Sequence, residues 1–170
     1  AFRDSENQNL WALDIGSSTG GFTEALLEYG FLKVAAVDVG RGQLHEKLRK
    51  DSRVVVCEET DCRHLSEEFL RARHLLGGPR IVTVDISFNS IRRILPSLIA
   101  LAPRALFVLL FKPQFELARS IPKPGGRAPE KESQESLKEM LLFLKTLGLD
   151  PLMIEASQIK GREGNQETFI

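Results

Sequence analysis

Two acids and one lysine stand where short apolar segments end or begin, and together they could do chemistry. Asp85 follows residues 80–84, and Lys112 follows the strongly apolar residues 105–111. A lysine in this position is costly unless it is paired, and Asp85 is the available partner. Glu167 joins them if its own strand runs antiparallel beside the strand that precedes Lys112. A lysine between two carboxylates suits general-base or orienting work on a hydroxyl group. A structural ion pair is the alternative.

A glycine-rich segment near the start of the sequence has the pattern of a ligand-binding loop. An apolar run ends in Asp14-x-Gly16, and a small, flexible turn precedes a segment with helical spacing. Backbone N–H groups in such a strand–loop–helix unit receive anionic ligands. The acid at the strand tip suits a ligand with both an amine and a carboxylate, such as S-adenosylmethionine. The residues assigned to this loop are Asp14, Gly16, Ser17, Ser18, Thr19, Gly20, Gly21 and Phe22.

The spacing of the glycines argues against two other nucleotide-binding loops. Glycines at positions 16, 20 and 21 do not match the G-x-G-x-x-G fingerprint, which disfavours a dehydrogenase. No Lys-Ser or Lys-Thr follows, as a P-loop would require. A tight strand–helix turn without a ligand remains the alternative for this segment.

Acidic residues also follow the next two apolar segments. Asp38 lies 24 positions after Asp14, where an acid hydrogen-bonds ribose hydroxyls in nucleotide-binding sheets. Val39 and Asp85 are assigned to the same cofactor pocket. Asp61 follows the third segment and could accept a hydrogen bond from an adenine amino group. The alternative for Asp61 is an acid at the N-terminus of the following helix.

The segments that must position these residues alternate between apolar runs and helical patterns. Strands are predicted at residues 10–15, 33–37, 54–57, 80–84, 105–110, 149–156 and 166–170. Helices are predicted at residues 22–29, 44–50, 65–76, 91–101 (bent or interrupted near Pro96) and 130–147. This alternation predicts an α/β fold with a parallel sheet covered by helices on both faces. Adjacent strands lie ~4.8 Å apart, so Asp85 and Lys112 are expected to meet at the ligand-binding edge.

Length and charge restrict the class of protein. A chain of 170 residues suits one domain with its own core. Lys and Arg together number 23, as do Asp and Glu. The chain therefore has no net positive charge that would favour binding to nucleic acid. A local basic rim would still permit an RNA substrate. Its candidate members are Arg92, Arg93, Lys112, Arg119, Lys123 and Arg127.

Cysteine content and hydropathy argue against a disulfide-stabilised protein, a metal site and a membrane-spanning segment. Two cysteines make no disulfide framework, so a reduced, cytoplasmic setting is expected. Cys57, Cys62 and His64 lack a fourth ligand and a paired spacing, so no metal site is expected. The longest apolar run is too short to cross a membrane.

Several motifs resemble the TlyA type of FtsJ-fold RNA methyltransferases, which are often labelled hemolysins. The motifs are Asp14-x-Gly-Ser-Ser-Thr-Gly-Gly-Phe-Thr, Val37-Asp-Val-Gly-x-Gly-Gln-Leu44, Asp85-Ile-Ser-Phe88, Lys112-Pro-Gln-Phe-Glu116 and Ile159-Lys-Gly-x-Glu-Gly-Asn-x-Glu167. The last two are far more specific than the glycine loop.

The resemblance implies a Rossmann-like methyltransferase fold whose seven-stranded sheet is mostly parallel, with the last strand antiparallel. It implies S-adenosylmethionine as donor, S-adenosylhomocysteine as product, and 2′-O-methylation of ribosomal RNA, free or in ribosomal subunits. Such enzymes use a Lys-Asp-Lys-Glu tetrad, and Asp85, Lys112 and Glu167 match its last three members.

The first lysine of the tetrad should precede the first strand, but residues 1–9 contain no lysine. The family's N-terminal RNA-binding domain is also absent. We therefore expect residues 1–170 to be a single methyltransferase domain cut from a longer protein. The alternatives are a non-catalytic RNA-binding module, which the missing lysine favours, and a membrane-lytic hemolysin, which the lack of a membrane-length segment disfavours.

Overall fold

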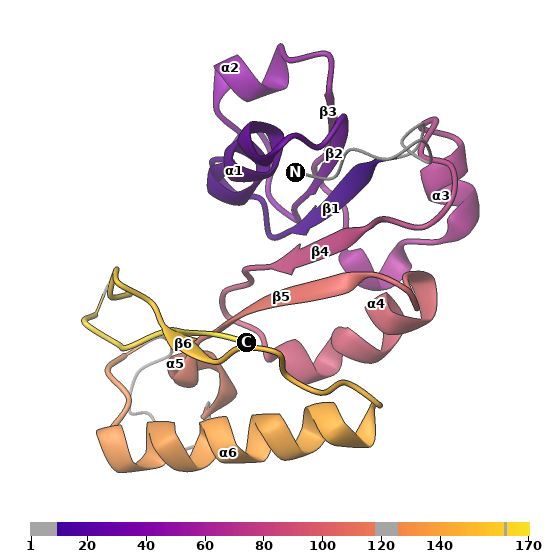
Figure 1. Cartoon of the computed structure of the whole chain (residues 1–170). Coiled ribbons are helices and arrows are strands. Elements are labelled where there is room, and N and C mark those ends of the chain that lie inside the picture. Colours follow the sequence, from indigo (N-terminus) through magenta and orange to yellow (C-terminus); the bar gives the residue numbers. More distant parts are fainter. Residues whose placement is uncertain (1–9, 118–125, 162) are drawn as a thin grey trace. The chain divides into compact units, whose positions relative to one another are not determined.

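The computed structural model describes residues 10–117, 126–161 and 163–170 (Figure 1). The chain forms two compact units. The first comprises Ala1–Asp85 and Ser97–Phe107, and the second comprises Ile86–Pro96 and Val108–Ile170. The prediction of a single methyltransferase domain stays a prediction.

The first unit contains four parallel strands in the order β3-β2-β1-β4. They are β1 (Trp11–Ile15), β2 (Lys33–Val37), β3 (Val54–Cys57) and β4 (Ile81–Val84). All five residues of β1 are buried. This is expected for a strand that pairs with a strand on each side and is covered on both faces of the sheet. Ile15 pairs with Val37 on one side and with Val84 on the other. The residues that follow these strands therefore share one edge of the sheet.

Five short helical elements accompany these strands. They are α1 (Gly21–Tyr29), α2 (Glu46–Arg49), the 3-10 helix η2 (Cys62–His64), α3 (Glu67–Arg71) and α4 (Leu95–Leu101, which begins in the second unit). Helix α1 places Leu26 and Leu27 in a core cluster with Val34 of β2 and Leu48 of α2. Each such side chain contributes about 1.5–3 kcal/mol when fully buried. This core fixes the start of α1 against the ends of the strands.

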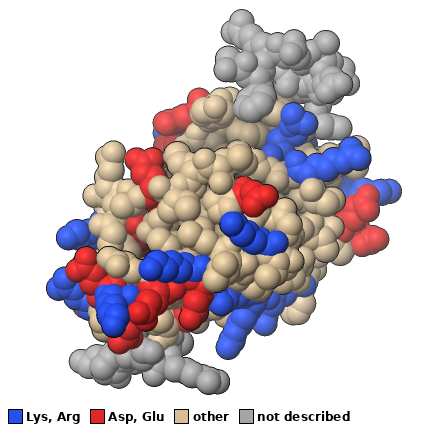
Figure 2. All heavy atoms as spheres, turned by 60° about the horizontal axis from the view of Figure 1, so that its bottom comes forward, with Lys and Arg blue, Asp and Glu red and all other residues tan. Residues whose placement is uncertain are grey.

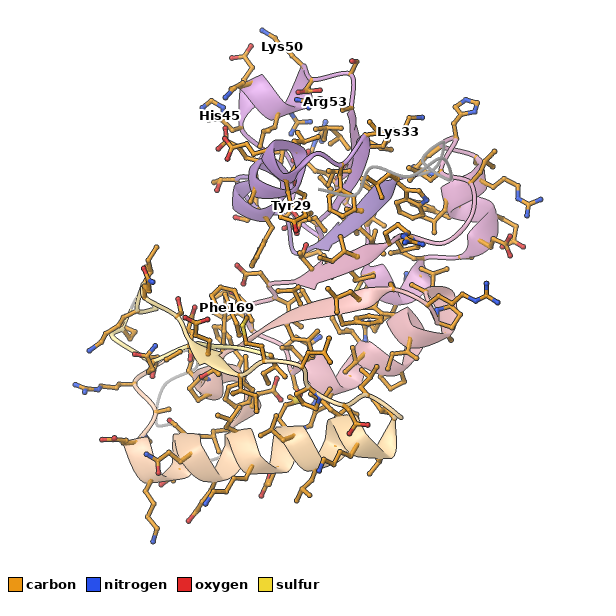
Figure 3. All side chains as sticks on the ribbon, viewed as in Figure 1. Tyr29, Lys33, His45, Lys50, Arg53 and Phe169 are labelled. Atoms are coloured by element: carbon orange, nitrogen blue, oxygen red, sulfur yellow. The ribbon has the colours of Figure 1, made fainter. Side chains whose placement is uncertain are left out.

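The second unit contains the antiparallel part of the sheet and the longest helix. Its elements are η3 (Ile91–Arg93), β5 (Leu106–Phe111, which begins in the first unit), α5 (Pro113–Glu116), α6 (Glu130–Thr146), β6 (Glu155–Ala156) and β7 (Thr168–Phe169). Strand β7, where Phe169 is labelled in Figure 3, runs antiparallel to both β5 and β6. Helix α6 buries Met140 and Leu144 and exposes Leu142.

The predicted sheet is confirmed: its seven strands follow the order β3-β2-β1-β4-β5-β7-β6, and the last strand in sequence is antiparallel. The expected strand at 149–156 is wrong over most of its length, because only Glu155–Ala156 pairs. Pro151 can donate no backbone hydrogen bond, and Leu152 is 87% exposed. The strand predicted at 166–170 is likewise reduced to Thr168–Phe169.

Three predicted helices also differ in detail. The helix expected at 65–76 is shortened to α3, with η2 lying before it, and α3 is followed by His74 in a left-handed conformation (φ +60°). The helix at 44–50 is shortened to α2, because His45 caps its start through the Lys47 N–H instead of lying inside it (Figure 3). The interruption in 91–101 falls at Ile94, before Pro96, since proline is tolerated in the first turn of α4.

Within the described ranges, no helix has both the length and the apolar character that a membrane crossing requires.

Candidate functional site

The glycine loop between β1 and α1 is held by backbone hydrogen bonds. The N–H groups of Gly16 and Ser17 both donate to the Val37 carbonyl, at 2.8 and 3.1 Å. Gly20 has φ +105°, and a Cβ atom there would lie 2.2 Å from Leu48 Cδ1. Only glycine fits this position, and the turn is therefore fixed against the core immediately before α1 begins.

Asp38 connects this loop to the end of β2. Its Oδ2 accepts a hydrogen bond from the Ser18 N–H at 2.8 Å, and its Oδ1 accepts one from the Gly40 N–H at 2.7 Å. A carboxylate has about four lone-pair sites, so Asp38 retains acceptor capacity for a ligand hydroxyl. The next side chain, Val39, is 72% exposed beside it. The structure thus brings the predicted loop and the predicted ribose-binding acid together.

Asp14 lies beneath the loop, not on its surface. Its side chain is 0% exposed, and it accepts hydrogen bonds from the hydroxyls of Thr23 (2.6 Å) and Thr83 (2.8 Å). Burial raises its pKa to about 6, against the opposing effect of the two hydroxyls. The nearby Asp85 charge acts in the same direction as burial. Asp14 therefore links β1 with α1 and β4 and supports the loop from inside.

Asp61 occupies the position that its alternative interpretation described. It caps η2 by accepting from the Arg63 N–H at 2.9 Å, and the Arg63 guanidinium also donates to it. These hydrogen bonds lower the pKa of Asp61 to about 2. An adenine contact for Asp61 stays a prediction.

Glu58 was missed by the sequence analysis, although it follows β3 directly. It accepts from the N–H groups of Gly42 (2.8 Å) and Gln43 (2.9 Å), and from Arg49 at 2.6 Å. These contacts lower the pKa of Glu58 to about 2. Its position after a strand and opposite a glycine-containing loop was the available signal. Glu58 holds the segment that follows Asp38.

Lys112 and Glu167 lie directly beyond the paired part of β5 and β7. The last pair is Phe111 with Thr168, and Lys112 follows Phe111 while Glu167 precedes Thr168. The expected antiparallel strand beside β5 is therefore confirmed. Lys112 Nζ lies 3.4 Å from Ser87 Oγ. Asp85 belongs to the first unit, where its N–H donates to the Ile15 carbonyl at 2.9 Å.

The Glu167 carboxylate is closely surrounded. It is 9% exposed, and its Oε1 accepts from Gln114 Nε2 at 3.2 Å. A Cβ atom on Gly161 would lie 2.5 Å from this oxygen. Gly161 therefore makes the space that Glu167 occupies.

A cavity of about 550 Å³ lies in the second unit, and its lining includes Phe111, Thr168, Arg127 and Lys160. Since side chains alternate between the faces of a sheet, Phe111 and Thr168 point away from the face of Lys112 and Glu167. Next to it, Asn165 accepts from the Ala128 N–H (2.8 Å) and donates to the Gly126 carbonyl (3.1 Å).

The residues of the predicted basic rim are only partly available to bind RNA, because one of them is near acidic side chains. Arg92 lies 3.8 Å from Glu116 and 3.4 Å from Glu139. Arg119 and Lys123 lie outside the described residues. Basic and acidic side chains are interspersed on the face seen in Figure 2. Among the residues that the structure describes, no group of three or more His, Cys, Asp or Glu could hold a metal ion.

Comparison with known proteins gives consistent matches. A family model described as FtsJ-like methyltransferase matches residues 2–170. The chain is 41% identical over 160 residues to the 16S/23S rRNA (cytidine-2'-O)-methyltransferase TlyA of Mycobacterium tuberculosis, covering 93% of this chain and 58% of the relative. It is 37% identical over 162 residues to Hemolysin A of Brachyspira hyodysenteriae, covering 94% of this chain and 66% of that protein.

A solved structure of a candidate hemolysin from Lactococcus lactis matches with a TM-score of 0.84 and 37% identity, covering 96% of this chain and 77% of that one. The chain thus spans 58% of the length of the M. tuberculosis relative and 66% of the B. hyodysenteriae relative.

Proposed function

Because this chain belongs to the FtsJ-like methyltransferase family, we propose that the complete protein transfers a methyl group from S-adenosylmethionine to a ribose 2′-hydroxyl of ribosomal RNA. The observation that carries this proposal is the antiparallel pairing of β5 with β7, whose last pair, Phe111 with Thr168, directly adjoins Lys112 and Glu167. The relative from M. tuberculosis is an rRNA (cytidine-2'-O)-methyltransferase, which supports this class of substrate. Ribosomal subunits in the cytoplasm are then the partners.

An unpaired polar group in the first unit supports S-adenosylmethionine as the ligand of the glycine loop. Ser17 Oγ is buried in the glycine loop without a hydrogen-bond partner among the described residues. We assign residues 16–22 to the methionine end of the cofactor, with Asp14 supporting them. Asp38 would hold the ribose hydroxyls, and Val39 and Asp61 the adenine. Bound there, the cofactor supplies a methyl group on a cationic sulfur, which is a good leaving group.

The second unit supplies the groups that act on the acceptor hydroxyl. Lys112 orients or deprotonates the ribose 2′-hydroxyl, and Glu167 stabilises the lysine in its working orientation. Positioning of the two reactants provides most of the acceleration. Asp85 is proposed on its match to the family tetrad and also as a cofactor contact.

One exposed aromatic residue of the second unit supports RNA as the substrate. Phe88 is 80% exposed and has φ +62°, a conformation that bulky residues rarely adopt. It directly follows Ser87, the residue that Lys112 contacts. An exposed ring at this place offers a stacking surface for an unpaired base.

The test measures transfer of labelled methyl groups from S-adenosylmethionine to ribosomal subunits from cells that lack the enzyme. Lys112→Ala in the complete protein should abolish transfer while cofactor affinity, measured by calorimetry, stays within about twofold. Lys145→Ala, at an exposed position on α6, is the matched control and should retain full activity. Full activity of Lys112→Ala would refute the proposed role. Absence of transfer by the wild-type protein to any ribosomal RNA would refute the proposed function.

A further inference from the structure

Glu116 ends α5 and is buried, although it is charged and lies next to a surface segment. Its side chain is 2% exposed. Oε1 accepts a hydrogen bond from the Ile91 N–H at 2.7 Å, and the hydroxyl of Ser90 donates to Oε2. Arg92 Nε lies 3.8 Å from the same oxygen. One carboxylate therefore holds three consecutive residues of another segment.

These contacts fix the start of η3. Ser90 caps this 3-10 helix by accepting from the Arg92 N–H at 3.2 Å, and Glu116 satisfies the Ile91 N–H. A buried N–H without an acceptor is unfavourable, so the carboxylate determines where this turn begins. The hydroxyl of Ser90 is held in the same arrangement.

Two further contacts join the same two segments, which are residues 87–91 and residues 112–116. Lys112 Nζ lies 3.4 Å from Ser87 Oγ, and the Phe115 and Phe88 ring centroids are 5.2 Å apart. Glu116 forms the third connection. Residues 112–116 therefore contact residues 87–91 at three places, through Lys112, Phe115 and Glu116.

The connections matter because residues 87–91 contain a strained backbone. Phe88 has φ +62° and an exposed ring. A bulky residue keeps such a conformation only when its surroundings impose it. Lys112 contacts this segment at Ser87, and Glu116 holds its other end at Ser90 and Ile91, two and three residues after Phe88.

We propose that Glu116 is a positioning residue, which sets residues 87–91 so that Ser87 and Phe88 stand in the correct place beside Lys112. This inference rests on the proposed function, because the purpose of the arrangement is to place Lys112 and an RNA base. Glu116 itself touches no substrate. It acts through the Ile91 N–H and the Ser90 hydroxyl.

The obvious alternative is that Glu116 is only a partner for Arg92. Glu139 allows the two roles to be separated. It also pairs with Arg92 (3.4 Å), its side chain is 69% exposed, and none of the described hydrogen bonds or ion pairs joins it to residues 87–91. Glu139→Ala is therefore the matched control. Glu116→Gln separates charge from hydrogen bonding, because the amide oxygen still accepts from the Ile91 N–H.

The experiment uses the complete protein with ribosomal subunits and labelled S-adenosylmethionine. Glu116→Ala should lower kcat by about tenfold to hundredfold, as misplacement of reacting groups does. Cofactor affinity should stay within about twofold. Glu116→Gln should recover most of kcat, and Glu139→Ala should match the wild type. A folded Glu116→Ala protein with wild-type kcat, or a Glu116→Gln protein as slow as Glu116→Ala, would overturn the proposal.

Amide hydrogen exchange gives a readout that does not depend on activity. The Ile91 amide should exchange faster in Glu116→Ala than in the wild type. Its exchange rate in Glu139→Ala should equal that of the wild type. If Glu116→Ala does not fold, Ser90→Ala removes one contact of the carboxylate, and it should lower kcat and speed exchange to a smaller extent. Unchanged exchange and unchanged kcat in Ser90→Ala would then refute the inference. A wild-type protein without methyl transfer would refute the proposed function, while the exchange result still tests the anchoring.

Discussion

The buried carboxylate of Asp14 should make the stability of the protein depend on pH in a measurable way. Burial raises its pKa from 3.8 to about 6 in the folded protein. In the unfolded chain the pKa returns to about 3.9. Because the folded pKa is the higher one, folding favours the protonated acid. The stabilising contribution is therefore complete below pH ~4 and is lost as the pH rises through about 6.

The size of this effect follows from the shift in pKa. A change of about two pKa units, at about 1.4 kcal/mol each, corresponds to about 3 kcal/mol. Asp14→Asn removes the titration, so the difference in free energy of unfolding between variant and wild type should change with pH. We expect Asp14→Asn to gain about 2 kcal/mol of this relative to the wild type between pH 4 and pH 7, whatever its absolute stability.

Urea unfolding at intervals from pH 4 to pH 8 measures this difference. Carboxylates with lowered pKa values, such as Glu58 and Asp61, titrate in both proteins and cancel in the comparison. Thr83→Val, which removes a hydroxyl that lowers the pKa of Asp14, should move the midpoint of the change to higher pH. A difference that stays constant from pH 4 to pH 7 would refute the reasoning.

Two predictions concern the surroundings of Glu167 and the lining of the cavity in the second unit. Gly161→Ala should reduce kcat with little change in cofactor affinity, because its Cβ would lie 2.5 Å from Glu167 Oε1; unchanged kcat would show that this carboxylate tolerates displacement. Asn165→Ala should lower the free energy of unfolding by about 1–3 kcal/mol, because the buried Ala128 N–H loses its acceptor. Chemical denaturation measures that loss, and a stability equal to the wild type would contradict it.

The sequence predicted the parallel strands well because burial leaves a strong signal. Strands β1 and β5 read as nearly continuous apolar runs, and each ends beside a residue of the candidate site. Asp38 was recognisable for the same reason, since it follows such a run. The strand ends and their order along the chain were therefore sufficient to locate the glycine loop and Lys112.

The features of the candidate site that the sequence did not predict depend on contacts between residues far apart in the chain. Glu116 holds residues about 25 positions before it, and Glu58 holds a loop about 15 positions before it. No periodicity records such pairs. The sequence also does not show that Thr23 and Thr83 enclose Asp14, and the predicted ligand contact of Asp14 stays a prediction.

The position of β7 between β5 and β6 has a consequence for the order in which the protein matures. During synthesis the four strands of the first unit are complete when residue 84 has emerged, but β5 waits for Phe169 and Thr168. The chain between Phe111 and Thr168 must be closed into a loop before these strands pair. The conformational entropy lost in closing this loop slows the pairing. Glu167 therefore arrives after every other residue named in the site. A ribosome making this chain therefore completes the glycine loop long before it adds Glu167.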